Sequence, residues 1–203
     1  MLIKRLCGLF LALLGCNTNA KTDIQQTSTP NLHEKAGYYS AYTDTVNCEY
    51  IPQHPAMVYS ERCQSLDKNY QIWKQNYEVQ TWLNIRYQSY HLNHQTTLLP
   101  MTVGEKVEWR YILKDNQPHY YALIYRIYVY DDYETDTLLK PAKSSYLIVV
   151  KLNQEKSCIV AKINGNQKNA NQKARLIADR SLNRQTPCLF EMWDENAESE
   201  FSK

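Results

Sequence analysis

Glycine is scarce in this chain of 203 residues, which contains only five. Loops that cradle phosphate need clustered glycines, because only glycine lets the backbone approach a ligand so closely. The sequence also lacks a G-x-S-x-G turn, a P-loop and an H-E-x-x-H pair, which mark common hydrolases, nucleotide-binding enzymes and zinc peptidases. We therefore expect a protein that is not an enzyme and that needs no cofactor.

The N-terminal apolar run is too short to span a bilayer. It extends from Leu6 to Leu14, is interrupted by Gly8 and follows the basic residues Lys4 and Arg5. A transmembrane helix needs about 20 apolar residues. A basic start followed by a short apolar run is typical of a secretory signal, so we expect residues 1–15 to direct export and to be removed.

The end of this signal, Leu13-Leu14-Gly15-Cys16, resembles the lipobox of bacterial lipoproteins. The resemblance implies cleavage before Cys16 and acylation of that residue, which anchors the chain in a membrane. Asn17 follows, in place of the Asp associated with inner-membrane retention in enteric bacteria, so we expect the outer membrane and a domain in the periplasm or at the cell surface. The alternative is a cleaved signal that merely contains a cysteine.

A net positive charge is missing from the expected mature chain. Without Lys4 and Arg5 it has 21 basic residues (23 minus 2) against 21 acidic ones. Nucleic-acid binding requires a basic surface, so we expect no nucleic-acid partner. Basic residues gather between Lys140 and Cys188, and acidic residues gather in a tail at 191–203. We expect this tail to fold over the basic segment; the alternative is a site for an anionic ligand.

The cysteines predict two disulfides. Of the six in the chain, one leaves with the signal and Cys16 is the lipid site, which leaves Cys48, Cys63, Cys158 and Cys188. Four thiols in an oxidising compartment favour two bridges, and Cys48–Cys63 with Cys158–Cys188 closes the shortest loops of the three possible pairings. A zinc site is the alternative, but no C-x-x-C or Cys/His finger spacing occurs, so we expect no metal.

Composition divides the rest of the chain into three parts. Residues 16–45 are rich in Thr, Asn, Gln and Ser and poor in large aliphatic side chains, which predicts a flexible tether. Residues 46–190 have the length of one globular domain. Residues 191–203 form the acidic tail.

Periodicity predicts an α+β domain. Apolar residues spaced by three and four favour a helix at about 64–76, whereas 77–95 fits a strand or a helix. Two hairpins are expected, and the strands that form them are 107–114 with 119–130, and 146–152 with 158–163. A helix is expected at 169–183. The fold class is thus an antiparallel sheet of about four strands with a C-terminal helix and a helical N-terminal segment, stapled by two disulfides.

Tyrosine is the unusual ingredient, with seventeen residues against three phenylalanines. The strand after His119 places Tyr120, Arg126, Tyr128 and Tyr130 at even positions, which predicts one amphipathic face. Such a face can stack on sugar rings or anchor a protein partner. The alternative is that these residues lie half-buried at the rim of the core.

Two histidines also require interpretation. His91 and His94 are three residues apart and would share a face if their segment were helical, which is the minimum geometry for two metal ligands. No third ligand is placed by sequence, so we interpret both as exposed side chains.

Together these features predict a membrane-anchored envelope lipoprotein with a non-catalytic binding domain. Its expected partner is a protein or an envelope polymer, and its role lies in assembly or in immunity against an incoming toxin. The alternative is a hydrolase acting on envelope glycan or lipid, which needs two carboxylates about 5–10 Å apart in a pocket. The acidic residues near strand ends, Glu105, Glu108, Asp131 and Asp132, are expected only to be solvated.

Overall fold

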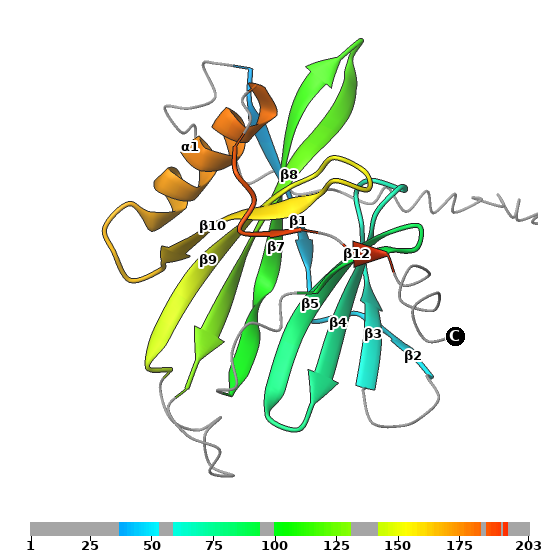
Figure 1. Cartoon of the computed structure of the whole chain (residues 1–203), viewed down its shortest axis with the longest axis vertical. Coiled ribbons are helices and arrows are strands. Elements are labelled where there is room, and N and C mark those ends of the chain that lie inside the picture. The colour runs from blue at the N-terminus through cyan, green and yellow to red at the C-terminus, as the bar shows by residue number, and fades with distance from the viewer. Residues whose placement is uncertain are drawn as a thin grey trace, which may run out of the picture. The chain divides into compact units, whose positions relative to one another are not determined.

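The computed structural model describes residues 37–52, 59–93, 100–130, 142–183, 186–191 and 193–194. All of them belong to the unit Leu32–Lys203. They form one twelve-stranded sheet and one α-helix (Figure 1). In chain order the elements are β1 (Tyr39–Asp44), β2 (Glu49–Ile51), β3 (Tyr59–Cys63), β4 (Gln71–Tyr77), β5 (Gln80–Tyr87), β6 (Tyr90–Asn93), β7 (Met101–Lys114), β8 (Gln117–Val129), β9 (Ser144–Lys151), β10 (Cys158–Asn164), α1 (Ala170–Asn183), β11 (Phe190–Glu191) and β12 (Trp193–Asp194).

The predicted fold class is wrong, because the domain is mostly β and its sheet has far more than four strands. The expected helix at 64–76 is absent: a turn follows β3, and β4 then begins at Gln71. The ambiguous segment 77–95 contains β5 and β6. The cause is burial on both faces, since Trp82, Leu83, Asn84 and Ile85 are all buried in β5. A strand buried on both faces lacks the apolar–polar alternation that identifies strands.

The first strand of the sheet lies within the segment 16–45 that was predicted to be a flexible tether. β1 lies within 16–45, yet it pairs with β7 in antiparallel register from Tyr39–Tyr111 to Asp44–Lys106. Thr43 accepts a 2.9 Å hydrogen bond from the buried indole nitrogen of Trp109. Residues 39–45 therefore belong to the domain, and Thr45 is buried and hydrogen-bonded to β7. The signal, Cys16 and the part of the tether before Gly37 lie outside the described residues.

Both predicted hairpins and the C-terminal helix are confirmed. β7 and β8 are joined through Asp115 and Asn116, whose φ values of 51° and 60° suit a turn with two left-handed residues. β9 pairs with β10 across the expected polar turn. α1 occupies the predicted position and packs on β8, β9 and β10 (Figure 1).

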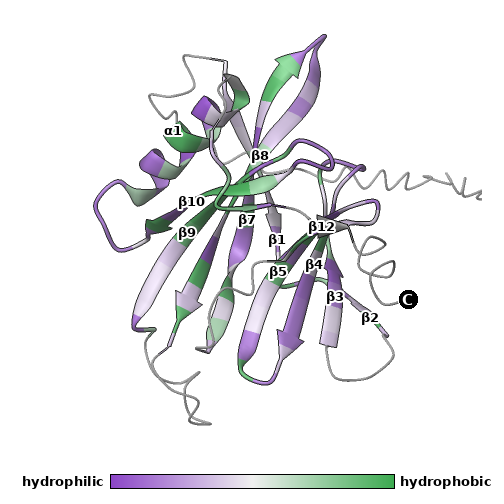
Figure 2. Ribbon diagram, in the orientation of Figure 1, coloured by the Kyte–Doolittle hydropathy of each residue, from purple (hydrophilic) through white to green (hydrophobic). Residues whose placement is uncertain are grey.

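Two hydrophobic clusters lie on opposite faces of the long strands. One cluster joins Ala174 and Ala178 of α1 to Val149 of β9. The other contains Ile148, which directly precedes Val149 in β9, together with residues of β4, β5 and β6. Because successive strand residues point to opposite faces, β9 is buried between α1 and the β4–β5–β6 part of the sheet. β9 contains the continuous apolar run Leu147-Ile-Val-Val150, as burial on two faces requires, and Figure 2 shows β9 with a hydrophobic segment.

The paired strands form a closed circuit. β5 pairs with β7 at Gln80–Met101, and β7, β8, β9 and β10 follow as neighbours. At the far end β10 pairs with β11 at Cys158–Glu191. β12 follows one residue later and pairs with β6 at Trp193–His91, and β6 pairs back to β5. The segment 190–194 therefore links the last long strand to the β4–β5–β6 part of the sheet.

The predicted disulfide pairing is confirmed. Cys48–Cys63 joins the start of β2 to the end of β3, and Cys158–Cys188 fixes the start of the closing segment on β10. Leu189 N adds a 2.7 Å hydrogen bond to Ile159 O. Two such bridges indicate an oxidising, exported environment. Within the ranges given above, no helix has the length and apolarity that crossing a membrane requires.

We expect the variant C158A/C188A to lose more stability than C48A/C63A. Loop entropy alone predicts a loss of about 3–4 kcal/mol for each bridge. The Cys158–Cys188 bridge spans 30 residues, whereas Cys48–Cys63 spans 15. The Cys158–Cys188 bridge also holds the segment 190–194, which closes the circuit of strands. Urea unfolding of the two double variants measures the difference, and an equal or larger loss in C48A/C63A would contradict the role of the closing segment.

Candidate functional site

The predicted surface of four residues is divided by a β-bulge. Between Arg110 and Tyr111 the register of β7 with β8 shifts, which reverses the alternation of β8 at that point. Tyr120 therefore lies on the same face as Trp109 and packs on its ring, with centroids 5.5 Å apart. Arg126, Tyr128 and Tyr130 follow the bulge and lie on the opposite face, which α1 partly covers. The four side chains do not form one surface.

The three residues beyond the bulge are partly engaged in local contacts. Arg126 Nη1 donates to Ser145 Oγ at 3.0 Å and to Gly165 O at 3.4 Å. A Cβ atom at Gly165 would collide with this guanidinium, so the glycine is needed for the contact. Tyr130 Oη lies 3.3 Å from Thr102 Oγ1. Arg126 therefore fastens the loop before α1 to the sheet.

His91 does not lie on a helix, so the helical spacing considered for a metal-binding pair does not apply to it. His91 lies on a strand and is buried, so the expectation that it is exposed is wrong, and His94 lies outside the described residues. Among the described residues, no three His, Cys, Asp or Glu side chains gather as metal ligands would. Of the four acidic residues near strand ends, Glu105 is exposed, Glu108 is buried, and Asp131 and Asp132 lie outside the described residues.

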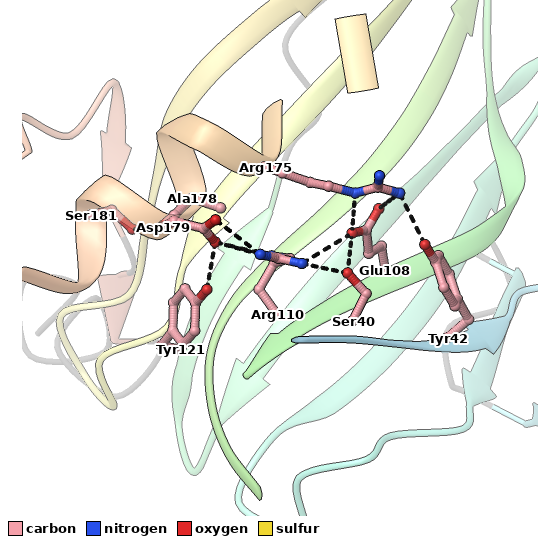
Figure 3. A network of polar contacts seen from close by, with 9 residues as sticks. All are labelled: Ser40, Tyr42, Glu108, Arg110, Tyr121, Arg175, Ala178, Asp179 and Ser181. Atoms are coloured by element: carbon pink, nitrogen blue, oxygen red, sulfur yellow. Dashed lines mark hydrogen bonds and ion pairs between the residues drawn. The ribbon is translucent and has the colours of Figure 1, made fainter. Parts of the chain in front are cut away.

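A buried network of charges fastens α1 to β7 (Figure 3). Arg110, which is 3% exposed, donates from Nη2 to both oxygens of Asp179 at 2.8 and 2.9 Å. Tyr121 Oη donates to the same carboxylate at 2.5 Å. Burial raises the pKa of Tyr121, and its bond to Asp179 raises it further, so the phenol stays neutral and remains a donor.

The network continues to a second carboxylate, Glu108. Arg175 of α1 donates from Nε at 2.7 Å and from Nη2 at 3.2 Å, and Ser40 Oγ donates at 2.6 Å. Burial lowers the pKa of Arg175, but the bonds and charge of Glu108 outweigh this effect and raise it overall. The expectation that Glu108 is only solvated is therefore wrong. Arg175, part of the basic segment, pairs with the sheet; the predicted contact with the acidic tail lies largely outside the described residues.

A second group of polar side chains lies on β4, β5 and β6, and the sequence did not predict that they come together. We call Gln75, Trp82, Asn84 and His91 the amide–indole cluster. Gln75 Oε1 accepts from Trp82 Nε1 at 3.0 Å and from Asn84 Nδ2 at 3.3 Å. Asn84 Nδ2 lies 3.4 Å from His91 Nδ1. Asn84 is 3% exposed, and its Oδ1 has no hydrogen-bond partner among the described residues.

Trp73 lies between the amide–indole cluster and Gln71, the exposed first residue of β4. Trp73 lies opposite Asn84 in the register of β4 with β5. The guanidinium of Arg86 makes a cation–π contact with the Trp73 ring, with Cζ 4.5 Å from the ring centroid. Trp73 Nε1 donates a hydrogen bond to Gln71 Oε1 at 3.0 Å. Figure 2 shows β4 as strongly hydrophilic although Ile72, Trp73 and Gln75 are buried. The indole is thus held by partners on both strands.

A pocket of about 350 Å³ is lined by Gln71, which accepts a hydrogen bond from Trp73, and by Arg62, which lies opposite Trp73 in the sheet. We call it the β3–β4 pocket, and its polar lining consists of Glu49, Arg62, Gln64, Ser65, Lys68 and Gln71. The side chains of Cys63 and Tyr70, both buried, complete the lining. The volume lies within the range of about 300–1,000 Å³ that is typical of small-molecule sites.

The loop between β3 and β4 has a defined shape that positions the lining. Asp67 Oδ1 accepts from the backbone N of Asn69 at 2.9 Å, and Asp67 O accepts from Ser65 Oγ at 2.7 Å. Tyr70 Oη accepts from Gln154 N at 2.6 Å, which ties the loop to the β9–β10 turn. Burial raises the pKa of Tyr70, so this wall of the pocket is uncharged. Cys63, which is bridged to Cys48, also lines the pocket.

The sequence contained one signal for this site that the predicted helix obscured. Gln71, Trp73 and Gln75 alternate with Ile72 and Lys74, and this pattern places amides and indoles together on one face of a strand. No comparable sequence pattern predicts that Arg62 and Lys68 line the same pocket as Gln71. Their positions depend on the loop between β3 and β4 and on the pairing of these two strands.

No protein-family model, curated protein or solved structure matches this chain. The fold and the site therefore define the protein in physical terms: an exported, disulfide-stapled β domain with one clamped helix and a small polar pocket.

We expect Asp179→Ala to lower the free energy of unfolding by about 3–5 kcal/mol, because it leaves the Arg110 guanidinium buried without its partner. Arg62→Ala is the control, since its pair with Glu49 is exposed and contributes about 1 kcal/mol or less. Urea unfolding measures both variants. Equal losses would show that the buried network does not fasten α1.

Proposed function

We propose that this chain is a membrane-anchored envelope lipoprotein whose β domain binds a partner through the β3–β4 pocket and does not transform it. The observation that carries the proposal is the convergence of two cations, two amides and a hydroxyl on one pocket, where Trp73 holds the lining residue Gln71. In a concave site, polar groups that converge fix the orientation of a ligand and provide specificity. The partner is a protein or an envelope polymer, and the role lies in assembly or immunity.

The geometry of the buried carboxylates does not favour the alternative hydrolase. Glu108 and Asp179 approach the same arginine, Arg110, but each is bound by a guanidinium beneath α1. A general acid needs a raised pKa and access to substrate. Glu108 and Asp179 are both buried beneath α1 and have no access to a substrate, so this pair supports a structural role.

Anchoring through Cys16 is the second part of the proposal. The two disulfides support an exported location, and the lipobox resemblance supplies the means of attachment. An acylated Cys16 followed by a polar tether would let the domain sample a partner at a distance from the membrane. The outer membrane is the proposed location.

We expect the membrane fraction of cells supplied with labelled palmitate to contain the wild-type chain in labelled form. Cys16→Ser should carry no label and should leave the membrane fraction, because the acyl chains provide the attachment. Radiolabelling followed by fractionation measures both. If Cys16→Ser remains membrane-bound, or if the wild type never takes up palmitate, the anchor is assigned wrongly.

We expect the pocket to determine what copurifies with the tagged chain from solubilised membranes. The variant R62Q/K68Q should lose most of the recovered protein or polysaccharide, because it removes both cations of the lining. Lys156→Gln changes an exposed cation on the β9–β10 turn and is the matched control. Tyr128→Ala tests the surface predicted from sequence. Loss of partner in Tyr128→Ala alone would move the binding site to the β8 face.

A further inference from the structure

We infer that the β3–β4 pocket binds an acidic saccharide, that is, a sugar unit that carries a carboxylate. This inference rests on the proposed binding function and specifies its ligand. Three properties of the pocket support it: paired cations at its rim, neutral side chains that bind hydroxyls, and an apolar wall. Each of them matches one part of such a sugar.

The charge of the lining favours an anion. Arg62 and Lys68 contribute two positive charges, and the only opposing lining charge is Glu49. Arg62 Nη2 contacts Glu49 Oε2 at 2.6 Å, but the two side chains are 48% and 65% exposed. Exposed pairs of this kind are weak and exchange readily. A carboxylate on the ligand can therefore take up the guanidinium in a bidentate contact, with Lys68 as a second charge.

The neutral lining suits a ligand that is rich in hydroxyl groups. Gln64, Ser65 and Gln71 each carry a side chain that donates and accepts hydrogen bonds. Gln71 Oε1 is held by the indole of Trp73, which fixes its side chain and leaves the amide N–H groups as donors. Ser65 Oγ donates to Asp67 O, which fixes the hydroxyl and leaves its oxygen as an acceptor. Groups fixed in this way lose little entropy when a ligand binds.

The apolar wall suits the C–H face of a sugar ring. Cys63 and Tyr70 supply the apolar lining, each with only 5% of its surface exposed, and the Tyr70 hydroxyl accepts a hydrogen bond from Gln154 N, which fixes the ring. Aromatic side chains with fixed orientation are common contacts for ligands that have one apolar and one polar side. A volume of about 350 Å³ admits a short saccharide segment.

Isothermal titration of the full mature chain with oligogalacturonate, a polymer of sugar acids, tests the inference. We expect measurable binding that weakens with added salt, as screening of two exposed cations requires. The neutral oligomer chitotetraose should bind at least fivefold more weakly. Lys68→Gln should weaken binding of oligogalacturonate about fivefold and leave chitotetraose unchanged, whereas Lys156→Gln should leave both unchanged.

Two outcomes would overturn the inference. If oligogalacturonate and chitotetraose bind equally, or if sodium acetate alone competes at the same carboxylate concentration, the pocket does not recognise an acidic sugar. If no saccharide binds but R62Q/K68Q still loses its partner in the copurification, the ligand class is wrong while the binding function stands. If the wild type and R62Q/K68Q also behave alike in the copurification, the proposed function itself fails.

Discussion

The backbone pairing of residues 190–194 is the constraint on which the rest of the domain depends. β11 adds to β10 at Cys158, and β12 adds to β6 at His91, so one short segment joins two parts of the sheet that are far apart in the chain. The Cys158–Cys188 bridge fixes where this segment begins. With the circuit closed, β4 and β5 are held against the main core, and the wall of the β3–β4 pocket has a rigid support.

The second constraint is electrostatic and concerns α1. Burying Arg110, Asp179 and Glu108 is costly unless each charge is compensated, and the network of Figure 3 compensates all of them. Arg175 and Asp179 come from the helix, so the network specifies both its rotation and its position along the sheet. This arrangement explains why two buried carboxylates occur in a domain for which we propose binding and no catalysis. Their charges are used to orient a helix.

Local patterns in the sequence predicted what depends on neighbours in the chain. The turn at Asp115-Asn116, the β9–β10 hairpin, α1 and the pairing of the four cysteines all follow from nearby residues. A helix was predicted where β4 lies, and 77–95 was ambiguous because β5 is buried on both faces. The bulge opposite Tyr111 divided the predicted surface on β8. The β3–β4 pocket depends on the conformation of a loop, which hydrogen bonds of Asp67 stabilise, and on pairing between strands. Neither can be predicted from the spacing of apolar residues in the sequence.

We propose that the ligand binds in the β3–β4 pocket, where Trp73 holds the lining residue Gln71. Fluorine NMR of the chain labelled with 5-fluorotryptophan tests it most directly, because Trp73 donates to the pocket residue Gln71 whereas Trp109 is fully buried in the core. On addition of oligogalacturonate we predict that the Trp73 resonance shifts and the Trp109 resonance stays in place. A Trp73 resonance that does not move when the saccharide is bound would contradict the account.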